Sequence, residues 1–400
     1  MAGPLEGIKV VDVSAVLSGP LCTMMLADQG ADVVKVETHG IGDTLRLPNF
    51  PRGGLTSFYM NANRNKRSLV VDLRQDEGRE IVHKLVRDAD VFVQNWRPGA
   101  AERLGLGESD LRAIQPELIY CSISGYGPTG PYAQRRVYDP IIQGITGHAG
   151  VQLNPEVPIR DLVRNVVSDK SSAYTAAQAI TAALFARERG AGGQHVIVPM
   201  LDASLAFFWS DGMIKHTFLG EEELPGVPLY ELYRLWETAD GHLIYFAATD
   251  SEFTGLFRAL ERPEWCEDER FNNAEARSVP ENRETLGGLI MEAILTQPTQ
   301  DLIERMAKEG VPVGPVLAPE QIAEDPQVIH NEAILEFEHP TAGRYQQAAP
   351  AARFDKTPQD PRRRLPPLHG EHTDEVLREL GYADADLERA RSAGVIPESP

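Results

Sequence analysis

The chain has 400 residues, of which 42% are hydrophobic and 24% charged, and its formal net charge at pH 7 is −20. This length and composition are typical of a globular protein with two or three domains and substantial cores. The acidic balance argues against nucleic acid and anionic membranes as partners. No apolar run reaches the ~18 residues that a membrane-spanning helix needs.

The cysteines and the N-terminal stretch indicate the compartment. Cys22, Cys121 and Cys266 are widely spaced, with neither CxxC nor Cys/His spacing, which favours a reducing environment and predicts no metal site. The first residues, MAGPLEGIKVVDV, lack a basic segment followed by an apolar one. We therefore expect a cytoplasmic protein.

The first part of the chain alternates between predicted strands and helices. Strands are expected at residues 8–13, 32–37, 68–73, 91–94 and 118–124, and helices at residues 20–29, 77–87 and 109–114. This order predicts an α/β fold with a doubly wound, mostly parallel, Rossmann-like sheet that binds ligands at the carboxyl ends of its strands. The first turn, residues 14–20, lacks GxGxxG, so a dinucleotide site with Glu37 as its acid is a weak alternative.

The second part of the chain has a different pattern of predicted elements. A helix following Asp169 and ending at the glycines of 190–193 should lead into a strand at 195–198 and a long helix at 203–218. Residues 220–228 indicate a linker, and 231–319 a smaller α+β domain. A hairpin around Gly343 and a helix at 372–380 complete the chain.

Asp169 stands at the predicted start of an Ala-rich helix, which gives its carboxylate two interpretations. It can be an N-cap that accepts hydrogen bonds from backbone N–H groups. It can also be a nucleophile kept ionised by the helix dipole, beside N–H groups that stabilise an oxyanion. Lys170 could lower the pKa of Asp169 or simply face the solvent.

Two further features also have a structural and a functional interpretation. The basic run at residues 63–67, NRNKR, is either an exposed surface or a phosphate-binding loop. Trp96 follows a strand and can either pack or stack on a base such as adenine. The sequence contains no GxSxG, HExxH or P-loop motif.

Taken together, these segments resemble the class III CoA-transferase family, which includes formyl-CoA and carnitine CoA-transferases and the related 2-methylacyl-CoA racemases. The matching segments are LEGIKVVDVSAVLSGPLCTMMLADQGADVVKVE, NRNKRSLVVDL, VQNWRPGAAERLGL, SGYGPTGPY, the VSD that contains Asp169, GQHVIVPMLDASL, DGHLIYFA, GVPVGPVL and GEHTDEVLRELGY. Their order and spacing cover most of the chain.

The resemblance implies a large CoA-binding domain formed by residues 1–220 and the returning segment 331–400, with a small α+β domain at 221–330. It implies an interlocked homodimer. It also implies that Asp169 is the nucleophile that carries CoA as an aspartyl thioester between an acyl-CoA donor and a carboxylic acid acceptor. Coenzyme A is then a substrate, and no tightly bound cofactor is expected.

The family's contacts to CoA and substrate carry over where positions match. Asn95 and Trp96 would line the adenine or pantetheine side, Arg103 would meet phosphate, and Asp139 stands where some transferases carry Glu. The full set implied is Val16, Leu17, Ser18, Arg74, Asn95, Trp96, Arg103, Arg136, Tyr138 and Asp139. Leu17 replaces the Gln that formyl-CoA transferase-like members use on a small dicarboxylate.

Two alternatives to a transferase stay open. A 2-methylacyl-CoA racemase needs a base on each face of the α-carbon, and this chain has Tyr138 where the racemase branch carries His. His148, ten residues further on, would need a different backbone path. The other alternative is a CoA-binding protein without catalysis.

Overall fold

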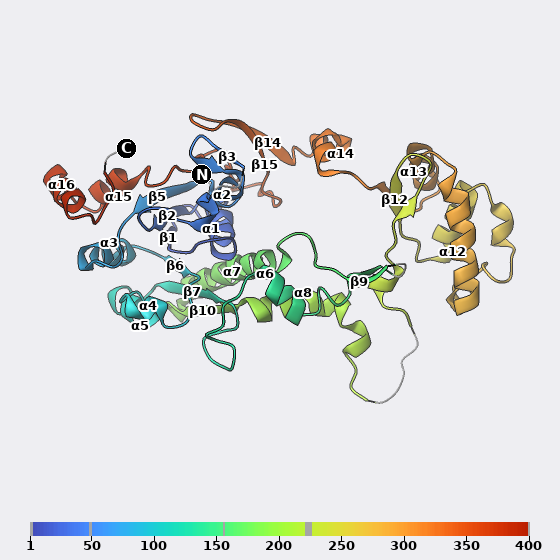
Figure 1. Cartoon of the computed structure of the whole chain (residues 1–400), viewed down its shortest axis with the longest axis horizontal. Coiled ribbons are helices and arrows are strands. Elements are labelled where there is room, and N and C mark those ends of the chain that lie inside the picture. Colours follow the sequence, from blue (N-terminus) through green and yellow to red (C-terminus); the bar gives the residue numbers. More distant parts are fainter. Residues whose placement is uncertain (1–2, 48–49, 155–156, 221–225, 399–400) are drawn as a thin grey trace. The chain divides into compact units, whose positions relative to one another are not determined.

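The computed structural model describes residues 3–47, 50–154, 157–220 and 226–398. Contacts divide the chain into two units, one formed by Met1–Glu221 with Asn331–Pro400 and the other by Glu222–His330. Figure 1 shows both, with the C-terminal segment returning to the unit that holds the N-terminus. Most of the linker predicted at 220–228 lies outside the described residues.

Six strands of the described chain form one parallel sheet in the first unit, in the order β10-β7-β6-β1-β2-β5. They are β1 (Lys9–Asp12), β2 (Asp32–Glu37), β5 (Lys66–Val70), β6 (Val91–Gln94), β7 (Ile119–Ser124) and β10 (His195–Pro199). The predicted α/β class with a mostly parallel sheet is confirmed. The strands are short. The central strand β6 is buried and largely apolar because both of its faces are covered, whereas β10, at one edge of the sheet, is partly exposed and β5, at the other, carries buried Lys66 and Arg67.

Helices cover both faces of this sheet, which makes it doubly wound (Figure 1). Alternate strand residues belong to different cores: Val10 and Val33 pack with α1 (Ser18–Asp28) and α7 (Val167–Ala186). Val11 and Val34 pack on the other side. The helices of that second core are α3 (Asp76–Arg87), α5 (Glu108–Ile114), α15 (Thr373–Glu379) and α16 (Asp384–Ser392).

The strand order reverses beside β1. The chain runs from β1 outward through β2 to β5, then returns to the opposite side of β1 for β6, β7 and β10. Loops that leave the carboxyl ends of β1 and β6 therefore diverge and leave a crevice between them. In open α/β sheets this crevice is where ligands bind.

Shorter elements complete the first unit. They are β3 (Pro51–Arg52), β4 (Leu55–Thr56), α2 (Ser57–Asn63), α4 (Ala100–Arg103), α6 (Asp139–Ile145), β8 (Leu153–Asn154), β9 (Val157–Arg160), α8 (Met200–Gly212) and the hairpin of β14 (Ile334–His339) and β15 (Gly343–Ala348). The helix predicted at 203–218 thus begins earlier and ends at Gly212, where 3-10 turn Ile214–His216 follows. The chain leaves α7 through a wider turn at Arg187–Ala191.

The second unit is a small α+β body. Its antiparallel sheet has the order β11-β12-β13. The elements are α9 (Leu229–Leu232), β11 (Trp236–Glu237), β12 (His242–Tyr245), α10 (Asp250–Ala259), α11 (Ala274–Ser278), α12 (Pro280–Leu295), α13 (Thr299–Lys308), β13 (Val313–Pro315) and α14 (Pro326–His330). Leu243, Phe257 and Met306 belong to its buried core.

The basic run at 63–67 is buried, which contradicts both sequence interpretations of it as an exposed surface or a phosphate loop. Its cations pair with acids inside the first unit. Arg64 contacts Asp28 at 2.7 Å, and Lys66, which is fully buried, contacts Asp12 at 3.0 Å. The charged residues of this run therefore form buried ion pairs, because each cation lies against a carboxylate from a distant segment of the chain.

Among the residues that the structure describes, no helix is both long and apolar enough to cross a membrane.

We predict that Asp12→Ala lowers the free energy of unfolding by about 3–5 kcal/mol, because Lys66 would be left buried without its partner. Glu336→Ala removes the exposed Arg344–Glu336 pair and should change the same quantity far less, because water screens the charges of an exposed pair. Urea unfolding followed by circular dichroism measures both. Equal effects for the two variants would contradict the prediction.

Candidate active site

A pocket of about 330 Å³ lies in the crevice where the strand order reverses. Its walls come from the loops after β1, β6 and β7 and from the starts of α1, α7 and α8. The lining residues are Ala15, Val16, Ser18, Asn95, Trp96, Arg97, Pro98, Ile123, Ser124, Gly125, Ala133, Arg135, Arg136, Val137, Tyr138, Asp169 and Met200. The pocket is large enough to hold part of a small-molecule ligand.

The 14–18 loop between β1 and α1 forms one wall. The backbone of Ala15 is held on both sides by the Asn95 side chain: the Ala15 N–H donates to Asn95 Oδ1 at 3.0 Å, and Asn95 Nδ2 donates to the Ala15 carbonyl at 2.6 Å. Val16 has a φ of 65°, in the left-handed region that a β-branched residue rarely adopts. Ser18 then opens α1 and is buried.

Asp169 is the third residue of α7 and not its N-cap, so the capping interpretation of Asp169 is wrong. Asp139, at the start of α6, caps the helix instead. Its carboxylate accepts the N–H groups of Ser168 at 2.7 Å and of Asp169 at 3.0 Å, and Gln143 donates to its other oxygen. The cap leaves the Asp169 side chain available to the pocket.

The pKa of Asp169 is raised to about 7, first because burial penalises its charged form and then because the Asp139 charge is close. The Ser18 backbone N–H and hydroxyl act in the opposite direction by hydrogen bonding to the carboxylate. A carboxyl group with this pKa is partly ionised near neutral pH and is more nucleophilic than an ordinary aspartate. Lys170, its neighbour in the sequence, has an exposed side chain.

Positive charge gathers at the pocket. Arg97, Arg135 and Arg136 line it and are exposed, and among the residues that the structure describes none of the three forms an ion pair. The Arg135 guanidinium lies over the Tyr132 ring at 3.8 Å, which orients the cation without neutralising it. Unpaired arginines suit phosphate or carboxylate ligands.

Seven of the predicted site residues line this pocket, and four do not. Those that line it are Val16, Ser18, Asn95, Trp96, Arg136, Tyr138 and Asp169. Trp96 also packs against the core of α3 and α5, so its two interpretations are compatible. Tyr138 is 71% exposed.

The other four lie elsewhere in the first unit. Leu17 is buried in a cluster with Leu45 and Tyr59. The Arg74 side chain is 84% exposed and bonds to Asp72 at 2.9 Å. Arg103 is exposed on α4, and Asp139 is buried behind Asp169.

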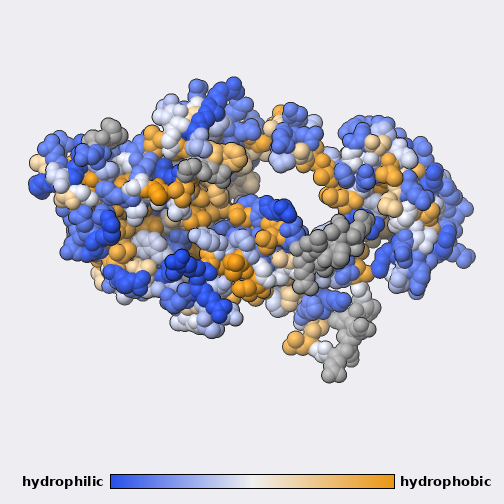
Figure 2. Space-filling model, in the orientation of Figure 1, coloured by the Kyte–Doolittle hydropathy of each residue, from blue (hydrophilic) through white to orange (hydrophobic). Residues whose placement is uncertain are grey.

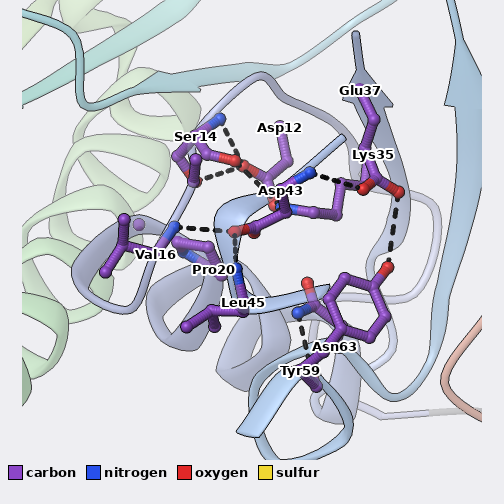
Figure 3. A network of polar contacts seen from close by, with 12 residues as sticks. Asp12, Ser14, Val16, Pro20, Lys35, Glu37, Asp43, Leu45, Tyr59 and Asn63 are labelled. Atoms are coloured by element: carbon purple, nitrogen blue, oxygen red, sulfur yellow. Dashed lines mark hydrogen bonds and ion pairs between the residues drawn. The ribbon is translucent and has the colours of Figure 1, made fainter. Parts of the chain in front are cut away.

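Sequence reasoning missed the polar groups that support the site. Asp12, Lys35, Glu37 and Asp43 form a buried network beneath the 14–18 loop (Figure 3). The available signal was the presence of ionisable residues within apolar strands of a parallel sheet, where an unpaired charge is not tolerated. No group of His, Cys, Asp or Glu side chains suited to a metal ion is found in the described part of the chain.

Comparison with known proteins yields one consistent family. The model of CoA-transferase family III matches residues 5–373. The chain is 33% identical to succinyl-CoA:glutarate CoA-transferase of Homo sapiens, with 99% of this chain and 90% of the relative covered. It is 30% identical to formyl-CoA:oxalate CoA-transferase of Afipia carboxidovorans, with 100% and 99% covered. A crystal structure of a CAIB/BAIF family protein from Brucella suis superposes with a TM-score of 0.82 at 31% identity, covering 95% and 100%.

We predict that Asp139→Asn shifts the titration of Asp169 to lower pH by about one unit, because a like charge that disfavours ionisation is removed. Carbodiimide labels protonated carboxyl groups, so labelling of the Asp169 peptide, followed by mass spectrometry from pH 4 to 9, gives the midpoint. Asp202→Asn, which removes an exposed charge on α8, is the control and should leave the midpoint unchanged. An unshifted midpoint in the Asp139 variant would refute the electrostatic assignment.

Proposed function

Since the chain belongs to CoA-transferase family III, we propose that it transfers coenzyme A from an acyl-CoA donor to a carboxylic acid acceptor through a thioester on Asp169. The enzyme uses CoA thioesters as substrates and not as a tightly bound cofactor. The observation that carries the proposal is the buried Asp169 carboxyl group in the switch-point pocket, with its pKa near neutrality and Ser18 donating to it.

The proposed chemistry begins with attack of an Asp169 carboxylate oxygen on the thioester carbonyl, which breaks the C–S bond and gives a mixed anhydride and CoA thiolate. The thiolate attacks the Asp169 carbonyl carbon, releases the donor acid as its carboxylate and leaves aspartyl-CoA. The acceptor carboxylate attacks this thioester and expels the thiolate again. The thiolate then attacks the acceptor carbonyl of the second anhydride, which yields the new acyl-CoA and restores Asp169.

Burial and Ser18 have distinct roles in these steps. Burial removes water from the nucleophile and raises its pKa, which increases its reactivity once ionised. The Ser18 N–H and hydroxyl are placed to donate to negative oxygen at the Asp169 carboxyl group. We assign them to the oxyanions that form when this group is attacked.

Binding of the CoA portion is assigned to the residues around this carboxylate. Val16, Asn95, Trp96, Arg136 and Tyr138 line the same pocket and would contact the thioester arm or the adenine end. Arg74 and Arg103 lie outside the pocket and are exposed, so they remain proposed contacts for the phosphates of an extended CoA. Leu17 and Asp139 would act indirectly, by packing the loop and by capping α7.

We assign the acceptor to the dicarboxylic acids. The related enzymes are named for glutarate and oxalate. In this pocket Arg97 and Arg135, which form no ion pair in the described chain, are available to receive a second carboxylate. The side chain of Leu17 is buried and apolar, where formyl-CoA transferase-like members use Gln on a small dicarboxylate. Acceptors longer than oxalate are therefore favoured.

The racemase alternative gains no support from the site. Among the described residues that line the pocket none is a histidine. His148 is buried with its ring 5.0 Å from that of Phe208, and burial lowers its pKa. Tyr138, which stands where the racemase branch carries His, offers a phenol in place of an imidazole base.

An interlocked homodimer in the cytoplasm completes the proposal. Large apolar side chains are exposed on α7, β10 and α8, and Figure 2 shows hydrophobic groups among hydrophilic ones on the surface. The exposed apolar residues of these three elements include Tyr174, Phe185, Ile197, Phe207 and Trp209. Such surfaces on a soluble chain mark interfaces. The three cysteines are free thiols, as a reducing compartment would leave them.

We predict that incubation with succinyl-CoA followed by hydroxylamine converts Asp169 to a hydroxamate, because hydroxylamine cleaves anhydrides and thioesters. Peptide mass spectrometry locates the modification. Asp169→Asn should remove it and lower transfer by at least ~10³-fold, since the covalent path is closed, whereas Asp202→Asn should retain both. Transfer at the wild-type rate by the Asp169 variant would refute the mechanism.

The acceptor assignment is tested in the same system. The aspartyl-CoA form, isolated by rapid gel filtration, is mixed with glutarate, succinate, oxalate or a monocarboxylate, and new acyl-CoA is measured by chromatography. Faster discharge by glutarate and succinate than by a monocarboxylate of equal length is expected. Equal rates would remove the assignment to dicarboxylic acids.

The dimer is tested by light scattering during gel filtration. We predict a mass twice that of the 44.1 kDa chain, which persists on dilution because linked chains cannot separate without unfolding. A mass of one chain in an active sample would contradict it.

A further inference from the structure

The 14–18 loop places an apolar residue in a conformation that it does not adopt by itself. The φ of Val16 is 65°, and Val has a branched Cβ that crowds the backbone there. Such a conformation persists only where surrounding contacts impose it. The contacts on residues 14, 15 and 16 therefore determine where Ser18 lies at the start of α1.

One buried carboxylate makes the contact to Val16 itself. Asp43 Oδ1 accepts the Val16 N–H at 3.0 Å and also the Leu45 N–H at 3.0 Å (Figure 3). The Asp43 N–H in turn donates to Glu37 Oε2 at 3.0 Å. Asp43 is 2% exposed, so these bonds are shielded from water.

Lys35 connects this carboxylate to the other end of the loop. Its ammonium group lies 2.9 Å from Asp43 Oδ2 and donates to the Ser14 carbonyl at 2.9 Å. Burial lowers the pKa of Lys35, but the charges of Asp43, Asp12 and Glu37 raise it by more, so the net pKa is above its ordinary value. The Lys35–Asp43 contact is therefore an ion pair. One ion pair therefore fixes the loop at Ser14 and at Val16.

We propose that Asp43 is a positioning residue of the active site: paired with Lys35, it holds Val16 in the left-handed conformation and thereby keeps Ser18 on the Asp169 carboxylate. The inference rests on the proposed function in that Asp169 is the reacting group. Asp43 does not line the pocket and acts through the loop. A capping role in the 3-10 turn Thr44–Arg46 alone would leave Asp169 unaffected.

The chain offers a matched control. Asp28 is likewise buried, at 4% exposure, and is ion-paired with Arg64 at 2.7 Å and bonded to Asn65 at 2.9 Å. It lies at the far end of α1, and among the described residues it forms no hydrogen bond or ion pair with the 14–18 loop. Asp28→Asn and Asp43→Asn therefore remove equivalent charges, and only the second touches the loop.

The first measurement is independent of activity. Hydrogen–deuterium exchange of the peptide that contains residues 14–18 should be at least tenfold faster in Asp43→Asn than in the wild type. The reason is that an amide cannot accept from Val16 and Leu45 while facing the Lys35 ammonium with an oxygen. Asp28→Asn should leave this peptide unchanged. Equal exchange in wild type and Asp43→Asn overturns the inference, whether or not the protein is a transferase.

The second measurement follows Asp169. The Ser18 hydrogen bonds favour its ionised form, so their loss moves the midpoint of carbodiimide labelling to higher pH. Asp43→Asn should raise the midpoint and lower kcat more than it raises KM, whereas Asp28→Asn should lower only the Tm. In the double variant with Ser18→Ala, the shift should be smaller than the sum of the single shifts. Additive shifts of the midpoint overturn the inference about Asp43. The hydroxylamine result on the wild type is independent of them, because it tests only the proposed function.

Asp43→Glu covers the case in which Asp43→Asn does not fold. It keeps the charge that Lys35 needs but moves the carboxylate by one methylene, so the loop is displaced in a protein whose ion pair is retained. A raised midpoint supports the positioning role, and a wild-type midpoint overturns it.

Discussion

The buried ion pairs beneath the first strand are the constraint on which the site depends. Asp12 and Lys66 are fully buried, and burying the charge of either one without the other would strongly destabilise the folded state. Asp12 also accepts from the Ser14 N–H and from Thr23 on α1, so it joins β1, the following loop and the helix behind it. A parallel sheet usually carries apolar residues here. This chain uses charge to fix a loop whose conformation apolar packing does not specify.

At Asp169, too, one side chain has more than one role. Asp139 satisfies the first N–H groups of α7, which stabilises the helix, and its negative charge simultaneously opposes ionisation of the neighbouring carboxyl group. Ser18 acts in the opposite sense. The proposed nucleophile therefore has one neighbour, Asp139, that disfavours its ionised form and another, Ser18, that favours it. Asp139 lies on α6, which follows β7, and Ser18 lies on α1, which follows β1.

The sequence predicts those parts of this arrangement that depend on residues close together in the chain, and it fails for those that depend on residues far apart. Periodicity is local, so the strands from Lys9–Asp12 to His195–Pro199 and the α/β class were predictable. The buried state of residues 63–67 was not, because Lys66 and its partner Asp12 are 54 residues apart. The capping of α7 was missed for the same reason, since Asp139 lies 30 residues before Asp169. The resemblance brought Asp139 to attention, but its role came from geometry.

The C-terminal helices have a consequence for how the chain is made. Val376 and Leu387 complete the core on one face of the parallel sheet, yet they are synthesised after the entire second unit. On the ribosome α3 and α5 can cover part of that face early, but the part that packs against α15 and α16 stays open until these two helices emerge. The 222–330 unit, whose contacts are contiguous in sequence, already has all its parts by then. The first unit is therefore completed only after the second unit has been made. Until then, the open part of the sheet face is the surface through which a newly made chain is most vulnerable to aggregation.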